Sequence, residues 1–151
     1  MRDIKILCVG TVKEKYFRDG ITFFVSQINK KYPVSIVECD DEATPDKASE
    51  AEEFRIKDTE GKKLLEKIRD EDYVIALCID GRQYSSDVWR ERMQKRARLV
   101  SGSLVFVIGG SLGLSSTVVR RADEKLSFSA MTFPHQMMRM ILCEQIAGAF
   151  A

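Results

Sequence analysis

The stretch Tyr73-Val-Ile-Ala-Leu-Cys-Ile79 is apolar at nearly every position. A strand with one face in water alternates apolar and polar residues, whereas a strand inside a parallel sheet is apolar throughout because helices cover both of its faces. This stretch is therefore predicted to be an internal strand of a parallel sheet.

In both directions from this strand, short apolar runs alternate with segments of helical periodicity. The further expected strands are 4–9, 34–39, 104–108 and 125–128, and the expected helices are 13–31, 47–68, 85–98, 115–121 and 134–150. This alternation predicts an α/β fold with a mostly parallel sheet, helices on both faces and right-handed crossovers. Since no linker or repeat interrupts it, a single domain is expected to span residues 1–151.

Some expected details depend on single residues. Asp80-Gly81 is predicted to turn the chain after the apolar strand. Val88 is expected to face the core, and Gly61 is a point at which the charged helix could divide.

Composition limits the function classes. With 24 basic and 23 acidic side chains, the net charge is +1, so any RNA binding must come from a local patch rather than a global positive field. No apolar run approaches the roughly 18 residues of a membrane helix, and no secretory signal is recognisable. The protein is expected to be cytoplasmic, without a membrane partner.

The cysteines and the histidine give no metal signal. Cys8, Cys39, Cys78 and Cys143 form no C-x-x-C pair, and His135 is the only histidine. We expect buried free thiols, as in a reducing compartment, and no metal site.

The richest candidate for a ligand site is the turn Gly109-Gly-Ser-Leu-Gly113, which follows an expected strand. Ligands of open α/β sheets bind outside the carboxyl ends of the strands, and glycines let backbone N–H groups approach a ligand. No Lys-Ser/Thr follows the last glycine and the spacing is not G-x-G-x-x-G, so neither ATP nor NAD is favoured. A tight strand-to-helix turn explains the same residues equally well.

The segment Leu126-Ser-Phe-Ser-Ala-Met-Thr-Phe-Pro-His135 alternates hydroxyl and large apolar residues before a helix that Pro134 opens. Polar backbone beside apolar walls suits an adenine ring and a thioether chain, although an ordinary strand, turn and cap is favoured by spacing alone. His135 could be a general base, but a polar or core residue of the first helical turn is the more common role. Arg139 and Glu144 are expected to make packing or dimer contacts.

The stretch Arg90-Glu-Arg-Met-Gln-Lys-Arg-Ala-Arg98 is locally basic. Its five cations could neutralise phosphates, or they could form a solvated helical face. The sequence does not decide between the two.

Two C-terminal motifs carry a resemblance: Val105-Phe-Val-Ile-Gly-Gly-Ser-Leu-Gly-Leu114 and Arg121-Ala-Asp-Glu-Lys-Leu-Ser-Phe-Ser-Ala-Met-Thr-Phe-Pro-His-Gln-Met-Met-Arg139. Together with Ile6-Leu-Cys-Val-Gly-Thr-Val-Lys-Glu-Lys-Tyr16 and Asp40-Asp-Glu-Ala-Thr-Pro45, they closely resemble the SPOUT-class methyltransferases that modify N3 of a pseudouridine in large-subunit ribosomal RNA. The resemblance covers essentially the whole chain.

The resemblance implies a C-terminal trefoil knot, a homodimer with active sites near the subunit interface, and S-adenosylmethionine as cofactor. By motif match it also implies that the cofactor pocket is lined by one residue placed after the third strand, one of the glycine turn and six of the following segment: Leu77, Gly109, Phe128, Ser129, Ala130, Met131, Thr132 and Phe133. It implies ribosomal RNA, in the assembled ribosome or the large subunit, as partner. It identifies no catalytic residue.

The last helix departs from the family's pattern. The family usually has an aromatic-basic pair where this chain has Ala147 and Gly148, followed by a basic tail that is absent here. One alternative to an active methyltransferase is therefore a cofactor-binding module that has lost catalysis with this tail. Another is an unrelated nucleotide- or phosphate-binding α/β protein that uses the glycine turn.

Overall fold

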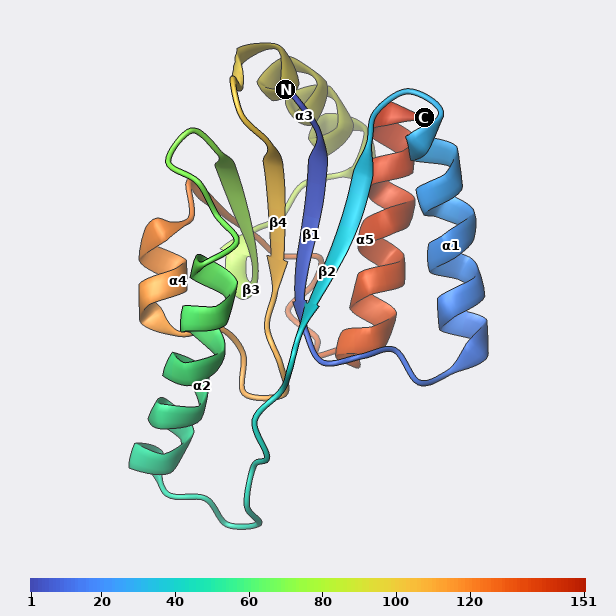
Figure 1. Cartoon of the computed structure of the whole chain (residues 1–151). Helices are drawn as coiled ribbons and strands as arrows, with labels where there is room; N and C mark the ends of the chain where they lie inside the picture. Colours follow the sequence, from blue (N-terminus) through green and yellow to red (C-terminus); the bar gives the residue numbers. More distant parts are fainter.

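The computed structural model describes residues 1–151 as one five-stranded sheet with five helices (Figure 1). The strands are β1 (Ile4–Val9), β2 (Val34–Cys39), β3 (Tyr73–Arg82), β4 (Leu104–Ile108) and β5 (Glu124–Leu126). The helices are α1 (Lys15–Asn29), α2 (Glu50–Leu65), α3 (Ser86–Leu99), α4 (Ser116–Arg121) and α5 (His135–Phe150). All strand pairs are parallel and the order is β2-β1-β4-β3-β5, so the predicted α/β class is confirmed and β3 is internal.

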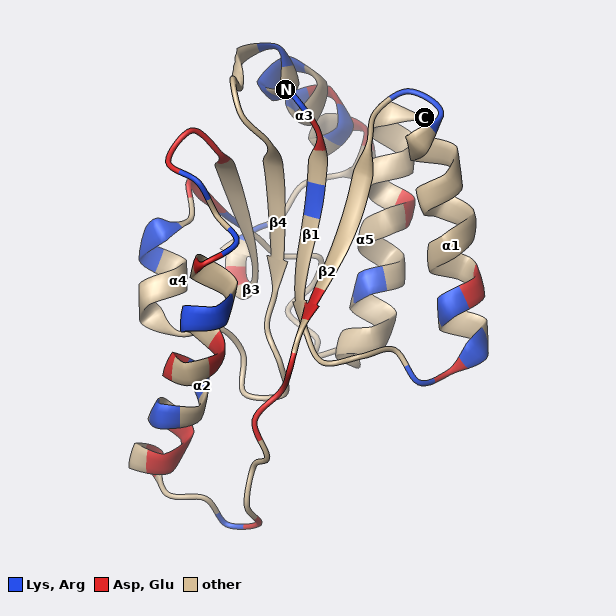
Figure 2. Ribbon diagram, in the orientation of Figure 1, with Lys and Arg blue, Asp and Glu red and all other residues tan.

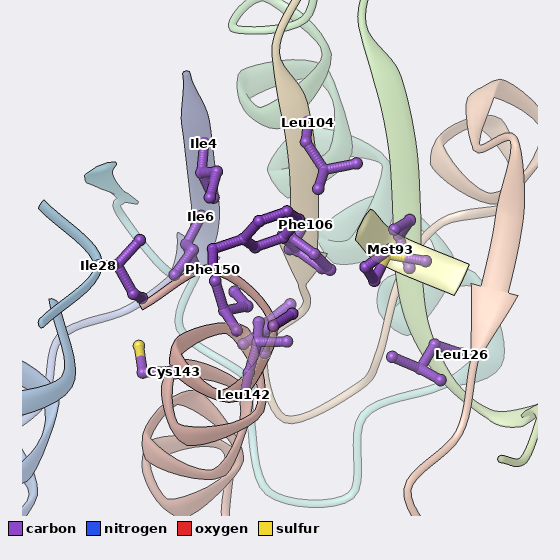
Figure 3. Packing of buried hydrophobic residues seen from close by; sticks show 14 of the residues in the cluster. Ile4, Ile6, Ile28, Met93, Leu104, Phe106, Leu126, Leu142, Cys143 and Phe150 are labelled. Atoms are coloured by element: carbon purple, nitrogen blue, oxygen red, sulfur yellow. The ribbon is translucent and has the colours of Figure 1, made fainter. Parts of the chain in front are cut away.

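Alternate strand residues face two different helical layers. Ile4, Ile6 and Phe106 lie in a core shared with α1, α3 and α5, part of which Figure 3 shows. Leu7 and Val107 lie in a second core on the other face, shared with α2 and α4. Since both faces are covered, β4 is apolar at every position and β3 is apolar from Tyr73 to Ile79, as the sequence predicts.

The four crossovers have the same hand. The connections that move toward the β2 edge carry α1 and α3 on the α5 face of the sheet. The connections that move toward the β5 edge carry α2 and α4 on the opposite face. A helix therefore changes face whenever the chain changes direction along the sheet.

The third strand is longer than expected. Asp80-Gly81 does not turn the chain, because β3 continues to Arg82, which pairs with Leu126 after an irregularity. A Cβ at Gly81 would lie 2.7 Å from the Leu126 carbonyl carbon, so only glycine allows this close approach. The fifth strand is shorter than expected and ends at Leu126, which leaves Phe128 in the following bend.

Two other expectations about helices are wrong. Gly61 does not divide α2, which runs without a break; its missing side chain lets α4 approach, since a Cβ there would overlap the Ser115 hydroxyl. Val88 does not face the core but is 50% exposed, whereas the neighbouring Trp89 is 3% exposed. The core-facing stripe of α3 therefore starts one residue later than predicted.

No helix of this structure has the length and apolarity that a membrane span requires.

Candidate functional site

Two connections meet at the carboxyl end of the sheet. The β4–α4 connection (residues 109–115) leads to the α2 face, and the β5–α5 connection (residues 127–134) leads to the opposite face. Because β5 lies on the far side of β3 from β4, the two connections run in opposite directions across the strand ends. Segments that are distant in the sequence therefore come together at this end.

Both connections line one cavity of about 710 Å³, compared with about 400 Å³ for a cavity at the opposite end of the sheet, beside Met1. The larger volume is within the 300–1,000 Å³ that small-molecule sites occupy. Its lining comes from β3, from the end of β4 with the glycine turn, and from the second bend with the start of α5: Leu77–Ile79, Ile108–Gly113, Leu126–Ser129, Met131–His135 and Met138.

The glycine turn depends on missing side chains. A Cβ at Gly109 would lie 2.7 Å from the backbone carbon of Gly113, which real side chains do not tolerate. Gly113 has φ +86° and donates its N–H to the Gly110 carbonyl at 3.0 Å. The turn thus folds back on itself, and the backbone of its three glycines borders the cavity.

Serine hydroxyls stabilise the second bend. Ser127 donates its N–H to the Arg82 carbonyl at 3.0 Å and its hydroxyl to the Ser129 carbonyl at 3.0 Å. The Ser129 hydroxyl accepts the Met131 N–H at 3.0 Å. The alternation of hydroxyl and apolar residues is now explained: the hydroxyls hold the bend while Phe128 and Phe133 contribute to the cavity wall.

The structure brings together seven of the eight predicted cofactor residues. Leu77, Gly109, Phe128, Ser129, Met131, Thr132 and Phe133 line the cavity, whereas Ala130 does not. Leu77 lies inside β3 rather than after it, at the last regular pairing with Leu126.

Sequence reasoning missed other lining residues, among them Cys78, Ile79 and Met138. For Cys78 and Ile79 the signal was present, because they end the apolar run of an internal strand. Met138 carried no comparable signal, since only the placement of α5 brings it to the wall.

The cavity wall is nearly free of charge. Its lining contains no Lys, Arg, Asp or Glu, and its titratable side chains are Cys78 and His135. Burial, reinforced by the nearby Asp80 carboxylate, raises the pKa of the Cys78 thiol, which keeps it neutral. A wall without cations is unsuited to a polyphosphate and suits a largely apolar ligand with a few polar groups.

The start of α5 is fixed against the loop after β1. Gln136 accepts the Lys13 N–H at 2.9 Å, and Arg139 pairs with Glu38 at 2.5 Å and donates to the Gly10 carbonyl at 3.2 Å. Arg139 is buried, so its role as a packing contact is confirmed within one chain. These contacts hold His135, whose Nδ1 is buried without a hydrogen-bond partner, at the cavity wall.

A buried carboxylate lies behind the glycine turn. Glu60 accepts the Glu42 N–H at 3.0 Å, and a Cβ at Gly110 would lie 3.3 Å from its other oxygen. Burial raises the pKa of Glu60, as do the Asp41 and Glu42 carboxylates, against the lowering effect of the Glu42 hydrogen bond. A larger residue at Gly110 would therefore disturb both the turn and this carboxylate.

Comparison with known proteins adds independent information. The family described as predicted SPOUT methyltransferase matches residues 1–151. A "Ribosomal RNA large subunit methyltransferase H" of Clostridioides difficile (strain 630) is 51% identical over 148 residues, which cover 98% of this chain and 93% of that protein. Proteins of the same name from Lacticaseibacillus casei (strain BL23) and Streptococcus thermophilus (strain CNRZ 1066) are 47% identical over 148 residues and 45% identical over 147 residues. These alignments cover 98% and 97% of this chain, and 93% and 92% of the relatives.

Proposed function

Because the chain belongs to the family of predicted SPOUT methyltransferases, we propose that it is an S-adenosylmethionine-dependent methyltransferase of large-subunit ribosomal RNA. We assign N3 of a pseudouridine as the methylated atom, on the resemblance of its two C-terminal motifs. The observation that carries the proposal is the convergence of two chain-distant bends on one uncharged cavity.

The residues of the cavity fit this cofactor. Leu77, Leu126 and Phe128 provide apolar surface for an adenine ring, and the glycine turn and the serine bend provide backbone polar groups. When bound, the cofactor supplies a methyl group already activated by its positive sulfur. A wall without Lys or Arg does not repel that sulfonium, whereas a nucleotide phosphate would find no cation there.

The protein residues contribute alignment and proton handling. The hydrogen-bonded bends hold the cofactor pocket in one shape, and alignment of two reactants can supply much of a barrier reduction. The imide nitrogen must lose its proton before it attacks, and His135, whose Nδ1 has no partner within the protein, is the candidate base of the cavity lining. No carboxylate or lysine of the lining competes for that role.

We further propose a trefoil knot and a homodimer. Parallel connections rarely cross at one edge of a sheet, and the crossing of the β4–α4 and β5–α5 connections is the feature that supports a knot. The homodimer rests on the resemblance, and a sedimentation measurement that gives the mass of a single chain would contradict it. A ribosomal substrate would place the protein in the cytoplasm.

Two measurements test the function. Calorimetry should detect micromolar S-adenosylmethionine or S-adenosylhomocysteine binding that fails in Gly110→Val, because the Cβ already meets Val9 and Glu60 at 3.2–3.3 Å. Preference for a free nucleotide over both compounds would overturn the cofactor assignment. Transfer of labelled methyl to ribosomes that lack the modification then tests catalysis, and cofactor binding without transfer would leave a binding module.

A further inference from the structure

An excess of basic side chains runs from the end of β3 through α3. Between Arg82 and Leu99 there are six basic and two acidic residues, whereas the whole chain has 24 and 23. Figure 2 shows this concentration on α3, while the charges of α2 are of both signs. The rest of the chain therefore carries more acidic than basic side chains, and the end of β3 with α3 offers a local positive charge to a polyanion.

Three arginines of this region stack on tyrosine rings. The Arg82 and Arg92 guanidinium carbons lie 5.1 and 4.8 Å from the centre of the Tyr84 ring, and that of Arg96 lies 4.5 Å from the centre of the Tyr73 ring. We call these five residues the arginine–tyrosine stripe. Stacking fixes the planar guanidinium groups in position and leaves their edge N–H groups free to donate hydrogen bonds.

The stripe has donor capacity that the protein does not use. The side chains of Arg82 and Arg96 make no ion pair and no hydrogen bond. Arg92 has a 3.6 Å ion pair with Glu124, whose carboxylate also accepts the Tyr73 hydroxyl at 2.6 Å. Each guanidinium has five N–H donors, so Arg82 and Arg96 can still bind several acceptor oxygens, whereas the Nε of Arg92 is buried.

The stripe leads to the cofactor cavity. Tyr84 borders a hollow of about 200 Å³ whose wall also includes Trp89 and Phe128. Phe128, with Leu126 and Ser127, lines the cofactor cavity as well, so the two spaces share a wall. Since a cavity of about 150 Å³ holds a benzene ring, this hollow has room for one pyrimidine ring.

We propose that the arginine–tyrosine stripe is the RNA docking surface, with an unstacked base next to the reacting one in the hollow beside Tyr84. This inference rests on the proposed function and names its substrate contacts. Arginines along a groove bind backbone phosphates, and the unpaired bases of looped RNA stack on aromatic rings or on guanidinium planes such as those of the stripe. The near-neutral charge of the whole chain agrees with such a local footprint.

The test combines Arg82→Gln and Arg96→Gln with a matched control, Arg55→Gln. Arg55 lies exposed on α2, on the opposite face of the sheet, and its side chain also has no ion pair. For ribosomes that lack the modification, each stripe variant should raise KM about three- to tenfold and reduce the salt slope of ribosome binding by about one. The control should change neither, and all three variants should bind S-adenosylhomocysteine like the parent.

The outcomes separate the docking surface from the activity. If the parent methylates ribosomes while both stripe variants keep its KM and salt slope, the docking surface is wrong and the activity stands. If the parent co-sediments with ribosomes in a salt-dependent way that the stripe variants lose, but transfers no methyl group, the docking surface stands and the proposed activity fails. A loss of ribosome binding that is insensitive to salt would indicate a protein contact and overturn the RNA assignment.

Discussion

The two ends of the sheet satisfy their backbone groups in different ways. At the amino end, the buried Asp72 carboxylate accepts the Arg69 N–H at 2.8 Å and the Ser103 N–H at 2.9 Å, and the Ser103 hydroxyl bonds to Asp3. At the carboxyl end, two bends hold their own shape and border a cavity of about 710 Å³ without a charged side chain. At the amino end, side chains satisfy the backbone groups of the strand connections, whereas at the carboxyl end the connections satisfy their own backbone groups and border the larger cavity.

The glycines that flank β4, Gly102 and Gly109, allow a direct comparison of the two ends. A Cβ at Gly102 would lie 2.6 Å from the Glu71 side chain, and one at Gly109 would lie 2.7 Å from the Gly113 backbone. The steric demand is the same, but only Gly109 borders the cavity. A tight glycine turn is therefore not evidence of a site unless the space beside it is open.

The largest effect is expected for Gly109→Ala. The added Cβ must push the Gly113 backbone away, so we expect S-adenosylhomocysteine affinity to fall at least about 300-fold, or ~3.4 kcal/mol, by calorimetry. Gly102→Ala is the matched control and should lower the melting temperature while leaving the affinity of the folded protein unchanged. Equal losses of affinity in both variants would show that the two ends do not differ in function.

Asp72→Ala should lower the stability of the protein and leave its affinity for S-adenosylhomocysteine nearly unchanged. The buried Ser103 N–H and the half-buried Arg69 N–H lose a charged acceptor, which costs about 2–3 kcal/mol of unfolding free energy in urea titrations. The affinity for S-adenosylhomocysteine should stay within about twofold, because Asp72 lies at the far end of the sheet from the cavity. A large loss of affinity at unchanged stability would contradict the division between the two ends.

The strand order and the cavity differ in how far the sequence could predict them. Apolar runs such as Tyr73–Ile79 and Leu104–Ile108 predict buried strands because local composition reports burial directly. The extension of β3 to Arg82 could not be predicted, because Asp80-Gly81 is a common turn pair and only the pairing with Leu126 keeps it in the strand. The exposure of Val88 was not predictable either, because neighbouring helix residues point in different directions and only the packing of α3 selects Trp89 for the core.

The glycine turn was visible as a candidate, and the second bend was visible only as an unusual alternation. Their convergence is a long-range property that depends on β5 lying on the far side of β3 from β4. Periodicity contains no information on strand order, so the resemblance rather than the pattern predicted that Gly109 and Met131 share one pocket. The stacking of Arg82 on Tyr84 was likewise not predictable, because both residues were expected in a loop.

Cysteine labelling gives a smaller effect that compares the cavity wall with the buried core. Burial raises the pKa of Cys8 and Cys143 to about 12, so these thiols should not react in the native protein at pH 8. Cys78 is half-buried at the cavity and should react first. S-adenosylhomocysteine at about ten times its Kd should slow that reaction about tenfold, as followed by mass spectrometry of the labelled peptides. Labelling of Cys78 that is indifferent to the compound would place the ligand elsewhere.

The smallest effect concerns Glu60, the buried carboxylate behind the glycine turn. Its pKa is raised in the folded protein, so the native state holds the proton more tightly than the unfolded chain does. The parent protein should therefore lose stability as the pH rises from about 4.5 through the raised pKa of Glu60. Glu60→Gln keeps an acceptor for the Glu42 N–H, and its unfolding free energy relative to the parent should increase over that interval. A difference that stays constant with pH would show that Glu60 ionises normally.

Backbone hydrogen exchange with and without S-adenosylhomocysteine tests the central claim most directly, because it reports both ends of the sheet in one experiment. The convergence of the two bends predicts slower exchange in residues 109–114 and 127–133 together, with no change around Asp72 and Ser103. Slower exchange in one bend alone, or in neither, would contradict the shared cofactor cavity.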